Sequence, residues 1–320
     1  MRDWLATLRR TPHARQRAIP RELLPDPAIG ALALKLSGLR RKLQRAFPAG
    51  DKHLAATIRT LLRLEIRMEE PYRIALMGEF NAGKSSLANL LVGQSMVPTL
   101  AVSNTRVPTV MRYAAVPSVI AVGDDGERLP VREGTLPDMG AVRHLEVGLP
   151  VARLQVMEIA DLPGASDPWL QPRVPDVTRL RIDAAIWCTL GTQAWKDSER
   201  MAWLNLPGCV RQHGLLIATN KDLLHGDQEA KVRGRLKHLA APLFQDIALL
   251  ATPQALSALD PAKRPADCAA IRETSGGAAV EAKVEAMLRG LAKRRCEGIA
   301  AAAEQAADRA LHRLGDTASR

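Results

Sequence analysis

Aromatic residues make up only 3% of this 320-residue chain, so leucine, alanine, valine and isoleucine must supply most of any core. The four cysteines are scattered and form no C-x-x-C pair, which argues against a disulfide framework and against a zinc site. No stretch of about 18 uncharged apolar residues occurs, so we expect no transmembrane helix. The N-terminus also lacks the apolar segment of a secretory signal. These absences favour a cytoplasmic protein.

The positive charge of the chain is concentrated near its N-terminus. The formal net charge is +11, and residues 1–45 hold 11 Lys and Arg against 3 Asp and Glu, which leaves a surplus of only three for the rest. Residues 1–26, rich in arginine and proline, are expected to form a basic mobile arm. Such an arm fits an anionic membrane surface at the inner face of the membrane, although a solvated basic face is the simpler alternative. Few aromatic residues accompany the arm, which argues against a nucleic acid partner.

Hydrophobic periodicity divides the remaining chain into two kinds of segment. Apolar residues three and four apart predict helices in 27–70 and again in 279–320, which we expect to pack as a small helical bundle. Between them, short apolar runs alternate with helical stretches, a pattern typical of a mostly parallel sheet covered by helices on both faces. We therefore predict an α/β domain over 71–260 and a connecting loop over 261–278.

The β-rich region 107–157 contains the turn signal Asp124-Asp125-Gly126, and we expect antiparallel edge strands there. The expected strands are 74–77, 107–113, 119–122, 154–160, 184–189, 215–219 and 247–251. The expected helices of the α/β domain are 85–92, 174–181, 197–204 and 228–240.

The first expected strand is followed by Gly-Glu-Phe-Asn-Ala-Gly-Lys-Ser-Ser, residues 78–86, which fits G-x-x-x-x-G-K-[ST] at every fixed position. A loop between a strand and a helix N-terminus directs backbone N–H groups at one point, where phosphate binds. Lys84 would stabilise the β- and γ-phosphates, and the Ser85 hydroxyl would bind Mg²⁺. The motif therefore predicts a P-loop NTPase. The other candidate phosphate-binding residues are Gly78, Asn81, Ala82, Gly83 and Ser86.

A second motif, Asp161-Leu162-Pro163-Gly164, follows another expected strand. An aspartate at a strand end can hold Mg²⁺, and the Gly164 amide can lie against a γ-phosphate because glycine permits close approach of the backbone. The segment between the two motifs contains three threonines whose hydroxyl could complete the magnesium site, and the γ-phosphate would then order that loop. These threonines are Thr99, Thr105 and Thr109.

A third motif, Thr219-Asn220-Lys221-Asp222, follows the apolar run 215–219. A carboxylate at this place would accept hydrogen bonds from the N1–H and the N2 amino group of guanine, which adenine does not offer. A site built for that pair rejects adenine because its own polar groups would be left unpaired. The segment therefore predicts a guanine nucleotide as the ligand.

Together these segments resemble the four GTP-binding motifs of the bacterial dynamin-like large GTPases. The segments 185–189 and 192–195 are similar to this group's sequence between the third and fourth motifs, so the resemblance covers about residues 70–255. It implies binding of GTP and GDP with Mg²⁺, hydrolysis of GTP, and a homodimer formed through the nucleotide face. Thr105 matches the threonine of the family's second motif, which favours it over the other two threonines.

The base motif departs from the family pattern, which runs [Asn/Thr]-Lys-x-Asp. If Asp222 is the guanine-reading acid, Lys221 stands one place late. If Asn220 and Lys221 are in register, Leu223 takes the place of the acid. The Leu-Leu pair after Asp222 matches the family's usual continuation, and this favours Asp222.

No residue stands where related enzymes position the attacking water. Phe80 replaces the glutamine of eukaryotic dynamins, and Ala165 replaces the glutamine of Ras-like enzymes. Hydrolysis by the isolated chain is therefore expected to be slow, unless Asn81, Asn104, Arg106 or a second subunit assists. Two alternatives stay open: a nucleotide-binding scaffold with negligible hydrolysis that recruits a partner or a membrane, and a P-loop ATPase.

Overall fold

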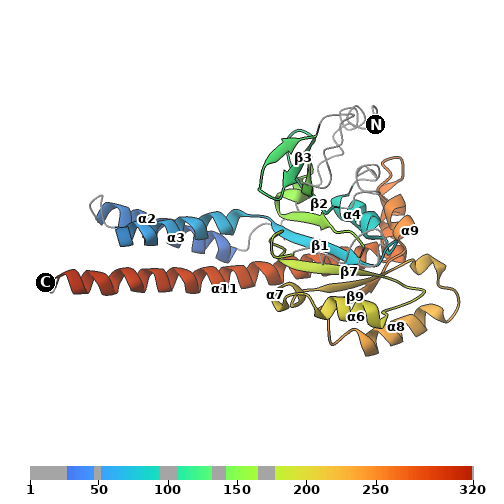
Figure 1. Cartoon of the computed structure of the whole chain (residues 1–320). Coiled ribbons are helices and arrows are strands. Elements are labelled where there is room, and N and C mark those ends of the chain that lie inside the picture. Colours follow the sequence, from blue (N-terminus) through green and yellow to red (C-terminus); the bar gives the residue numbers. More distant parts are fainter. Residues whose placement is uncertain (1–26, 47–51, 94–106, 132–141, 165–176, 319–320) are drawn as a thin grey trace. The chain divides into compact units, whose positions relative to one another are not determined.

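The computed structural model describes residues 27–46, 52–93, 107–131, 142–164 and 177–318. They fall into two compact units, one formed by 71–287 and the other by the described residues before 71 and after 287. Figure 1 shows the elements of both units. Among the residues that the structure describes, no helix combines the length and the apolar character that crossing a membrane requires.

Within the described residues, the first unit is built on a nine-stranded sheet with the order β4-β3-β5-β2-β6-β1-β7-β8-β9. The five neighbouring strands β6, β1, β7, β8 and β9 pair in parallel. In contrast, β2 is antiparallel to β6, and β3 is antiparallel to both β4 and β5. The predicted mostly parallel sheet with antiparallel strands near one edge is therefore confirmed. The strands are β1 (Tyr72–Gly78), β2 (Thr109–Tyr113), β3 (Ser118–Gly123), β4 (Arg128–Pro130), β5 (Val142–Leu149), β6 (Met157–Asp161), β7 (Ala184–Leu190), β8 (Leu215–Thr219) and β9 (Asp246–Leu249).

Helices cover both faces of this sheet. On one face, Ala75 of β1 belongs to a core cluster that includes Trp203 of α6 and Leu236 of α8. Ile74 points to the opposite face because side chains alternate along a strand, and α4 contacts β1 and β6 there. The helices of this unit are α4 (Lys84–Val92), α6 (Asp197–Leu204), α7 (Gly208–Arg211), α8 (Gln228–Leu239), α9 (Thr252–Ser257), α10 (Pro265–Ser275) and the start of α11 (Gly277–Ala318), with the short 3₁₀ helices η2 (Ala152–Gln155) and η3 (Lys221–Leu223).

The connecting loop predicted over 261–278 is wrong, because α10 occupies most of it. Pro265 stands in the first turn of this helix, where a missing N–H leaves no intrahelical hydrogen bond unmade. Arg264 pairs with Asp267 at 2.8 Å, and Gly276 ends the helix with a φ of 83°. Proline and glycine here mark the two ends of a helix.

Two further expectations differ from the structure. The strand predicted from residue 154 begins only at Met157, because the Val156 amide donates to the Arg153 carbonyl at 3.1 Å and closes the short helix η2. Residues 177–181 form turns in place of a helix, and Arg181 has a φ of 54°. The strands β4 and β5 were covered only by the general expectation of β structure in 107–157.

The second unit is a small bundle of N- and C-terminal helices, as the fold class predicted. It contains α2 (Pro27–Ala46), α3 (Lys52–Glu69) and the part of α11 after residue 287. Arg40 of α2 donates to Glu65 of α3 at 2.9 Å, and Arg295 donates to the backbone carbonyl of Glu70. The buried core of this unit consists of Leu36, Leu61, Met68, Ile299 and Ala303.

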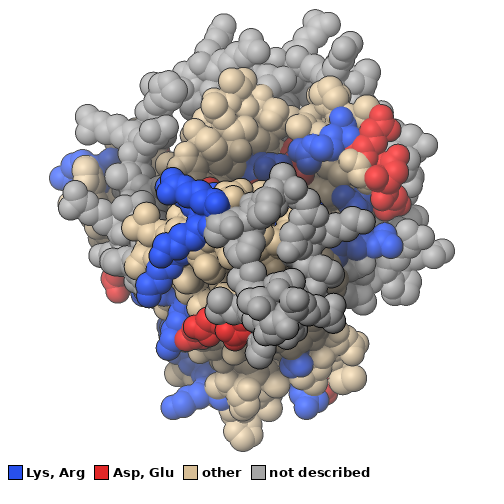
Figure 2. Space-filling model, turned by 90° about the vertical axis from the view of Figure 1, so that its left-hand side faces the viewer, with Lys and Arg blue, Asp and Glu red and all other residues tan. Residues whose placement is uncertain are grey.

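Helix α2 carries much of the positive charge near the N-terminus. It contains five Lys and Arg residues and no Asp or Glu, whereas the other six basic residues of 1–45 fall in the arm of residues 1–26, outside the described residues. Figure 2 shows one face of the molecule, on which Lys and Arg side chains are spread more widely than Asp and Glu side chains. The folded helix α2, and not the arm alone, therefore accounts for the basic N-terminal region.

Candidate functional site

The phosphate loop, residues 78–85, joins the end of β1 to the start of α4. Gly78 has a φ of 139°, and a Cβ placed on it would lie 2.1 Å from the carbonyl oxygen of Cys188 on β7, so only glycine fits. Asn81 and Gly83 also have positive φ values, of 58° and 82°. Loops with such left-handed residues form concavities of successive N–H groups that bind anions. The backbone of this loop therefore fits a phosphate group.

Lys84 is buried within the loop, with an exposed fraction of 8%. Its Nζ donates to the carbonyl oxygen of Glu79 at 2.7 Å and to that of Gly78 at 3.3 Å. An ammonium group held by two neutral carbonyls gains from an anionic acceptor, because charge-assisted hydrogen bonds are stronger. A nucleotide phosphate would thus replace the loop carbonyls as the hydrogen-bond acceptor of Lys84.

Ser85 and Asp161 meet below the loop. The Ser85 Oγ donates to Asp161 Oδ2 at 2.7 Å, whereas Asp161 Oδ1 is buried and has no hydrogen-bond partner in the described part of the chain. Burial raises the pKa of the Asp161 carboxyl, and the hydrogen bond from Ser85 and the charge of Lys84 oppose this rise only in part. A buried carboxylate oxygen without a partner, beside a hydroxyl, fits the hard oxygen ligands that Mg²⁺ prefers.

The turn Asp161-Leu162-Pro163-Gly164 packs directly on the phosphate loop. A Cβ placed on Gly164 would lie 2.9 Å from the backbone nitrogen of Phe80. The amide of Leu162 donates to the Leu76 carbonyl at 3.2 Å and fixes the start of the turn on β1. The backbone of Gly164 therefore lies beside the loop, as reading a γ-phosphate requires.

Thr109 is the one threonine candidate for the magnesium site that lies within the described residues. It opens β2, stands opposite Asp161 in the antiparallel register, and has a buried hydroxyl without a hydrogen-bond partner among those residues. Thr105, the candidate that the family resemblance favours, lies outside the described residues. The same holds for Thr99, Asn104, Arg106 and Ala165.

The base motif is tied to the phosphate loop by Thr219. Its Oγ1 lies 3.0 Å from the Ala82 carbonyl and 3.2 Å from the Thr189 carbonyl, and the side chain is fully buried. Three residues later, Asp222 has a buried Oδ1 with no hydrogen-bond partner among the described residues, whereas Leu223 is 51% exposed. An unpaired acceptor suits guanine recognition and an exposed leucine does not, which favours the register with Asp222.

Asn220 contributes to this motif through its backbone conformation, and Lys221 contributes through a side-chain hydrogen bond. Asn220 has a φ of 56° at the end of β8, which turns the chain into η3. The Lys221 Nζ donates to the carbonyl of Thr274 at 2.9 Å, at the end of α10. The segment expected to be a connecting loop therefore supports the base motif, and no sequence signal indicated that contact.

Known proteins resemble this chain in sequence and in fold. A sequence model of the Dynamin family matches residues 74–142. Dynamin-like protein 2 of Campylobacter jejuni is 25% identical over 202 residues, which cover 61% of this chain and 33% of that protein. The isoniazid-induced protein IniC of Mycobacterium tuberculosis is 36% identical over 141 residues, which cover 39% of this chain and 29% of that protein. Over residues 74–142, this chain is similar to proteins of the Dynamin family.

The chain thus spans about a third of the length of the curated relatives it matches. A solved structure of an oligomerised bacterial dynamin pair gives a TM-score of 0.51 at 20% identity. That pair is described as providing a mechanism for the long-range sensing and tethering of membranes. That similarity covers 75% of this chain and 39% of the other. It concerns the fold, and it confirms the predicted P-loop α/β class. The resemblance to bacterial dynamin-like GTPases is also confirmed.

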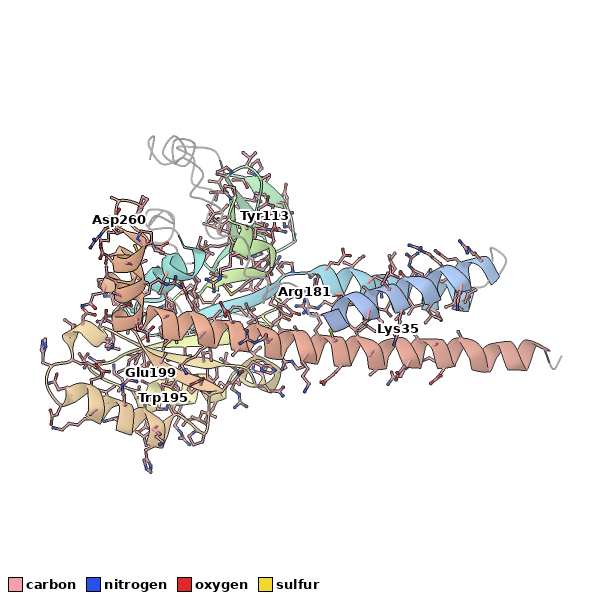
Figure 3. All side chains as sticks on the ribbon, turned by 180° about the vertical axis from the view of Figure 1, so that it is seen from behind. Lys35, Tyr113, Arg181, Trp195, Glu199 and Asp260 are labelled. Atoms are coloured by element: carbon pink, nitrogen blue, oxygen red, sulfur yellow. The ribbon has the colours of Figure 1, made fainter. Side chains whose placement is uncertain are left out.

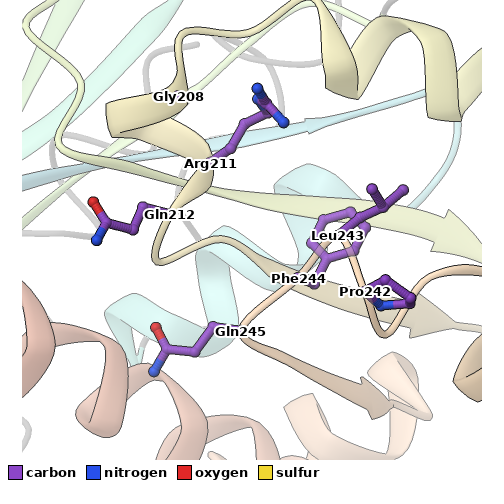
Figure 4. A pocket seen from close by; sticks show the side chains of 7 residues that line it. All are labelled: Gly208, Arg211, Gln212, Pro242, Leu243, Phe244 and Gln245. Atoms are coloured by element: carbon purple, nitrogen blue, oxygen red, sulfur yellow. The ribbon is translucent and has the colours of Figure 1, made fainter.

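A cavity of about 300 Å³ lies elsewhere in the dynamin-like α/β unit. Figure 4 shows its lining, which comes from α7 and from the turn before β9. These segments precede β8 and β9, whereas the phosphate loop follows β1, so the cavity lies at the opposite end of a parallel set of strands. It therefore does not belong to the nucleotide site. The lining residues are Gly208, Arg211, Gln212, Pro242, Leu243, Phe244 and Gln245.

Sequence reasoning missed a set of contacts between the phosphate loop and α6. Glu79 stands at a variable position of the loop motif, yet its carboxylate accepts from the Lys196 Nζ at 2.7 Å. Trp187 and Trp195 pack in the core, with ring centroids 6.2 Å apart. The Lys196 amide donates to the Glu199 carboxylate at 2.9 Å, but the Lys196 side chain has no acceptor that would complete a capping box, so no capping signature marks this segment in the sequence.

Proposed function

We propose that this chain is a switch protein of the dynamin-like type that binds Mg²⁺ and GTP and hydrolyses GTP to GDP and phosphate. The observation that carries this proposal is the contact between Ser85 and Asp161 below the phosphate loop, with one buried carboxylate oxygen left unpaired. A P-loop with a hydroxyl and an aspartate at this place is the arrangement that binds a magnesium nucleotide.

Each site residue has a proposed role. Lys84 stabilises the charge of the β- and γ-phosphates, Gly164 reads the γ-phosphate through its amide, and Asp222 accepts from guanine with Asn220 and Lys221 beside it. Ser85, Thr105 and Asp161 hold Mg²⁺, which when bound neutralises phosphate charge. The loop amides of Gly78, Asn81, Ala82, Gly83 and Ser86 bind the phosphate oxygens.

Nucleotide titration tests this proposal directly. We expect purified protein to bind GTP and GDP in the presence of Mg²⁺ and to bind GTP more weakly when the metal is chelated. ATP added as a competitor should not displace GTP, because Asp222 would face an adenine without matching donors. Displacement of GTP by equal amounts of ATP would favour the alternative of a P-loop ATPase.

We further propose that hydrolysis by the isolated chain is slow and that two copies associate through the nucleotide face. Phe80, at the position of the missing glutamine, is 56% exposed and has no group that orients water. A second subunit that stabilises the transition state would raise the rate by roughly 10³–10⁵ if it supplied an arginine. Turnover per molecule should therefore rise with protein concentration. Negligible turnover at every concentration, with and without anionic vesicles, would support the scaffold alternative.

The domain limits and the location of the protein remain proposals. We propose that 71–260 bind the nucleotide and that 27–70 and 279–320 serve as a neck. We also propose a cytoplasmic protein, peripheral to the inner face of the membrane through its basic N-terminal region. The high density of Lys and Arg in α2 supports this location, and so does the lack of a disulfide bond among the four cysteines of the described residues.

The buried carboxyl of Asp161 is expected to lower the unfolding stability of the nucleotide-free protein at neutral pH and to bind Mg²⁺ in the nucleotide complex. The substitution Asp161→Asn tests both effects. A carboxyl with a pKa raised by folding favours the folded state at low pH, and this contribution is lost as the pH rises through the raised pKa. In nucleotide-free protein at pH 7.5, Asp161→Asn should therefore raise the midpoint temperature of unfolding by roughly 2–4 °C. The same variant should lose the magnesium dependence of GTP binding.

Scanning calorimetry between pH 4 and pH 8 measures this effect. The difference between the variant and the unaltered protein should shrink as the pH falls. Asp260→Asn is the matched control, because Asp260 is exposed and an asparagine keeps its acceptor for the Ala262 amide. A variant at position 161 that is less stable at every pH would contradict the proposed cost of the buried charge.

A further inference from the structure

The side chain of Glu79 links the phosphate loop to the segment between β7 and α6. Lys196 Nζ donates to Glu79 Oε2 at 2.7 Å, and Ser198 Oγ donates to Glu79 Oε1 at 3.2 Å. Both carboxylate oxygens thus have a donor from the same segment. The Glu79 side chain is only 20% exposed, so water competes for it less than for a surface carboxylate.

A buried carboxylate fixes the backbone of Lys196. Glu199 is 3% exposed and accepts from the Lys196 amide at 2.9 Å, from Thr189 Oγ1 at 2.9 Å and from Trp187 Nε1 at 3.0 Å. A buried charge costs free energy unless donors satisfy it, and these three donors hold the start of α6 against β7. Lys196 is therefore presented from a rigid support.

The residue before Lys196 has an unusual backbone conformation. Trp195 has a φ of 61°, in the left-handed region that a bulky side chain rarely occupies. Its amide donates to Thr189 Oγ1 at 3.3 Å, and its ring packs edge-on against Phe244 with centroids 5.1 Å apart. Figure 3 labels Trp195 and Glu199 in this part of the unit. The packing of the Trp195 ring thus maintains a strained backbone conformation at residue 195. This conformation directs the next side chain, that of Lys196, toward the phosphate loop.

The same support reaches the other end of the loop. Thr219 Oγ1 lies within hydrogen-bond distance of the carbonyls of Thr189 and Ala82. The phosphate loop is therefore held at residue 79 through Lys196 and at residue 82 through Thr219, and both connections lead back to Thr189. Two anchored points define the course of the loop between them.

We propose that Glu79, Lys196 and Ser198 form a clamp that positions the phosphate loop to receive nucleotide phosphates. This inference rests on the proposed function of the same site. The carbonyl of Glu79 also accepts from Lys84, which must leave that carbonyl when phosphate binds. The clamp keeps the Glu79 peptide in place at that moment, so the loop does not have to be ordered again upon binding. These three side chains are positioning residues.

The test compares Lys196→Met and Glu79→Gln with Lys231→Met. Lys231 forms an exposed ion pair with Asp227 on α8 and serves as the matched control. Each clamp variant should bind GDP and a slowly hydrolysed GTP analogue about three- to tenfold more weakly, the effect of one lost charge-assisted hydrogen bond at a partly exposed site. The double variant should lose little more affinity than Glu79→Gln alone, because both changes act on the same contact between Lys196 and Glu79, whereas only Glu79→Gln also alters the acceptor of Ser198. Lys196→Arg should restore most of the affinity.

Hydrogen exchange of the nucleotide-free protein gives a readout that needs no ligand. Amides of residues 79–85 should exchange faster in both clamp variants, whereas the amides of β8 and the midpoint temperature should match the control. If neither the loop exchange nor the affinity differs from Lys231→Met, the clamp is refuted. If the unaltered protein binds no guanine nucleotide, the proposed function fails, and the exchange measurement alone decides whether the clamp holds the loop.

Discussion

Lys84→Ala should weaken Mg²⁺-dependent GTP binding by on the order of a hundredfold or more. The ammonium group is buried inside the loop and donates to the backbone carbonyls of Gly78 and Glu79, so it lies where a bound phosphate would accept from it. Its removal leaves the charge of the β- and γ-phosphates without a compensating cation at the centre of the site. The expected loss exceeds that of any single loop amide because several charge-assisted contacts disappear together.

Calorimetric titration of GTP with and without Mg²⁺ measures this loss. Lys237→Ala is a suitable control, since Lys237 is an exposed lysine on α8. The circular dichroism and unfolding temperature of both variants should show that the α/β unit stays folded. An unchanged affinity in folded Lys84→Ala would refute the assignment of the phosphate loop.

Asp222→Asn should change the base preference from guanine to xanthine, by on the order of a hundredfold in relative affinity. The carboxylate accepts from two donors of guanine, N1–H and the N2 amino group. Asparagine offers one acceptor and one donor, which match the N1–H and the C2 carbonyl of xanthine. When guanine binds to Asp222→Asn, the asparagine amino group faces the N2 amino group of the base, so that two donors meet without an acceptor. The free-energy cost of these unpaired donors lowers the affinity for guanine relative to xanthine.

Competition between GTP and xanthosine triphosphate measures the change, and Leu223→Asn is the matched control. Leu223 is exposed and occupies the acid position in the other register of the motif. In the register that we favour, Leu223→Asn leaves the preference for guanine intact. A switch to xanthine in Leu223→Asn, with none in Asp222→Asn, would show that the other register is correct.

The sequence predicted the phosphate loop and most of the sheet because their signals are local. The Gly78-to-Ser86 motif fixes backbone geometry within nine residues, and short apolar runs mark buried parallel strands without reference to the rest of the chain. Helix α10 was missed because Pro265 and Gly276 occur equally in loops and at helix ends. Residues around 154 were misread because an apolar run does not distinguish a 3₁₀ turn from the start of a strand.

By itself, the amino-acid sequence determined the class of fold, the phosphate loop and the candidates for metal and base recognition. Only the tertiary structure decided what holds that loop. Lys196 lies 117 residues from Glu79 along the chain, and Thr219 lies 137 residues from Ala82. No periodicity or motif encodes contacts at such separations. They arise because parallel pairing places the carboxyl ends of β1, β7 and β8 at one edge of the sheet.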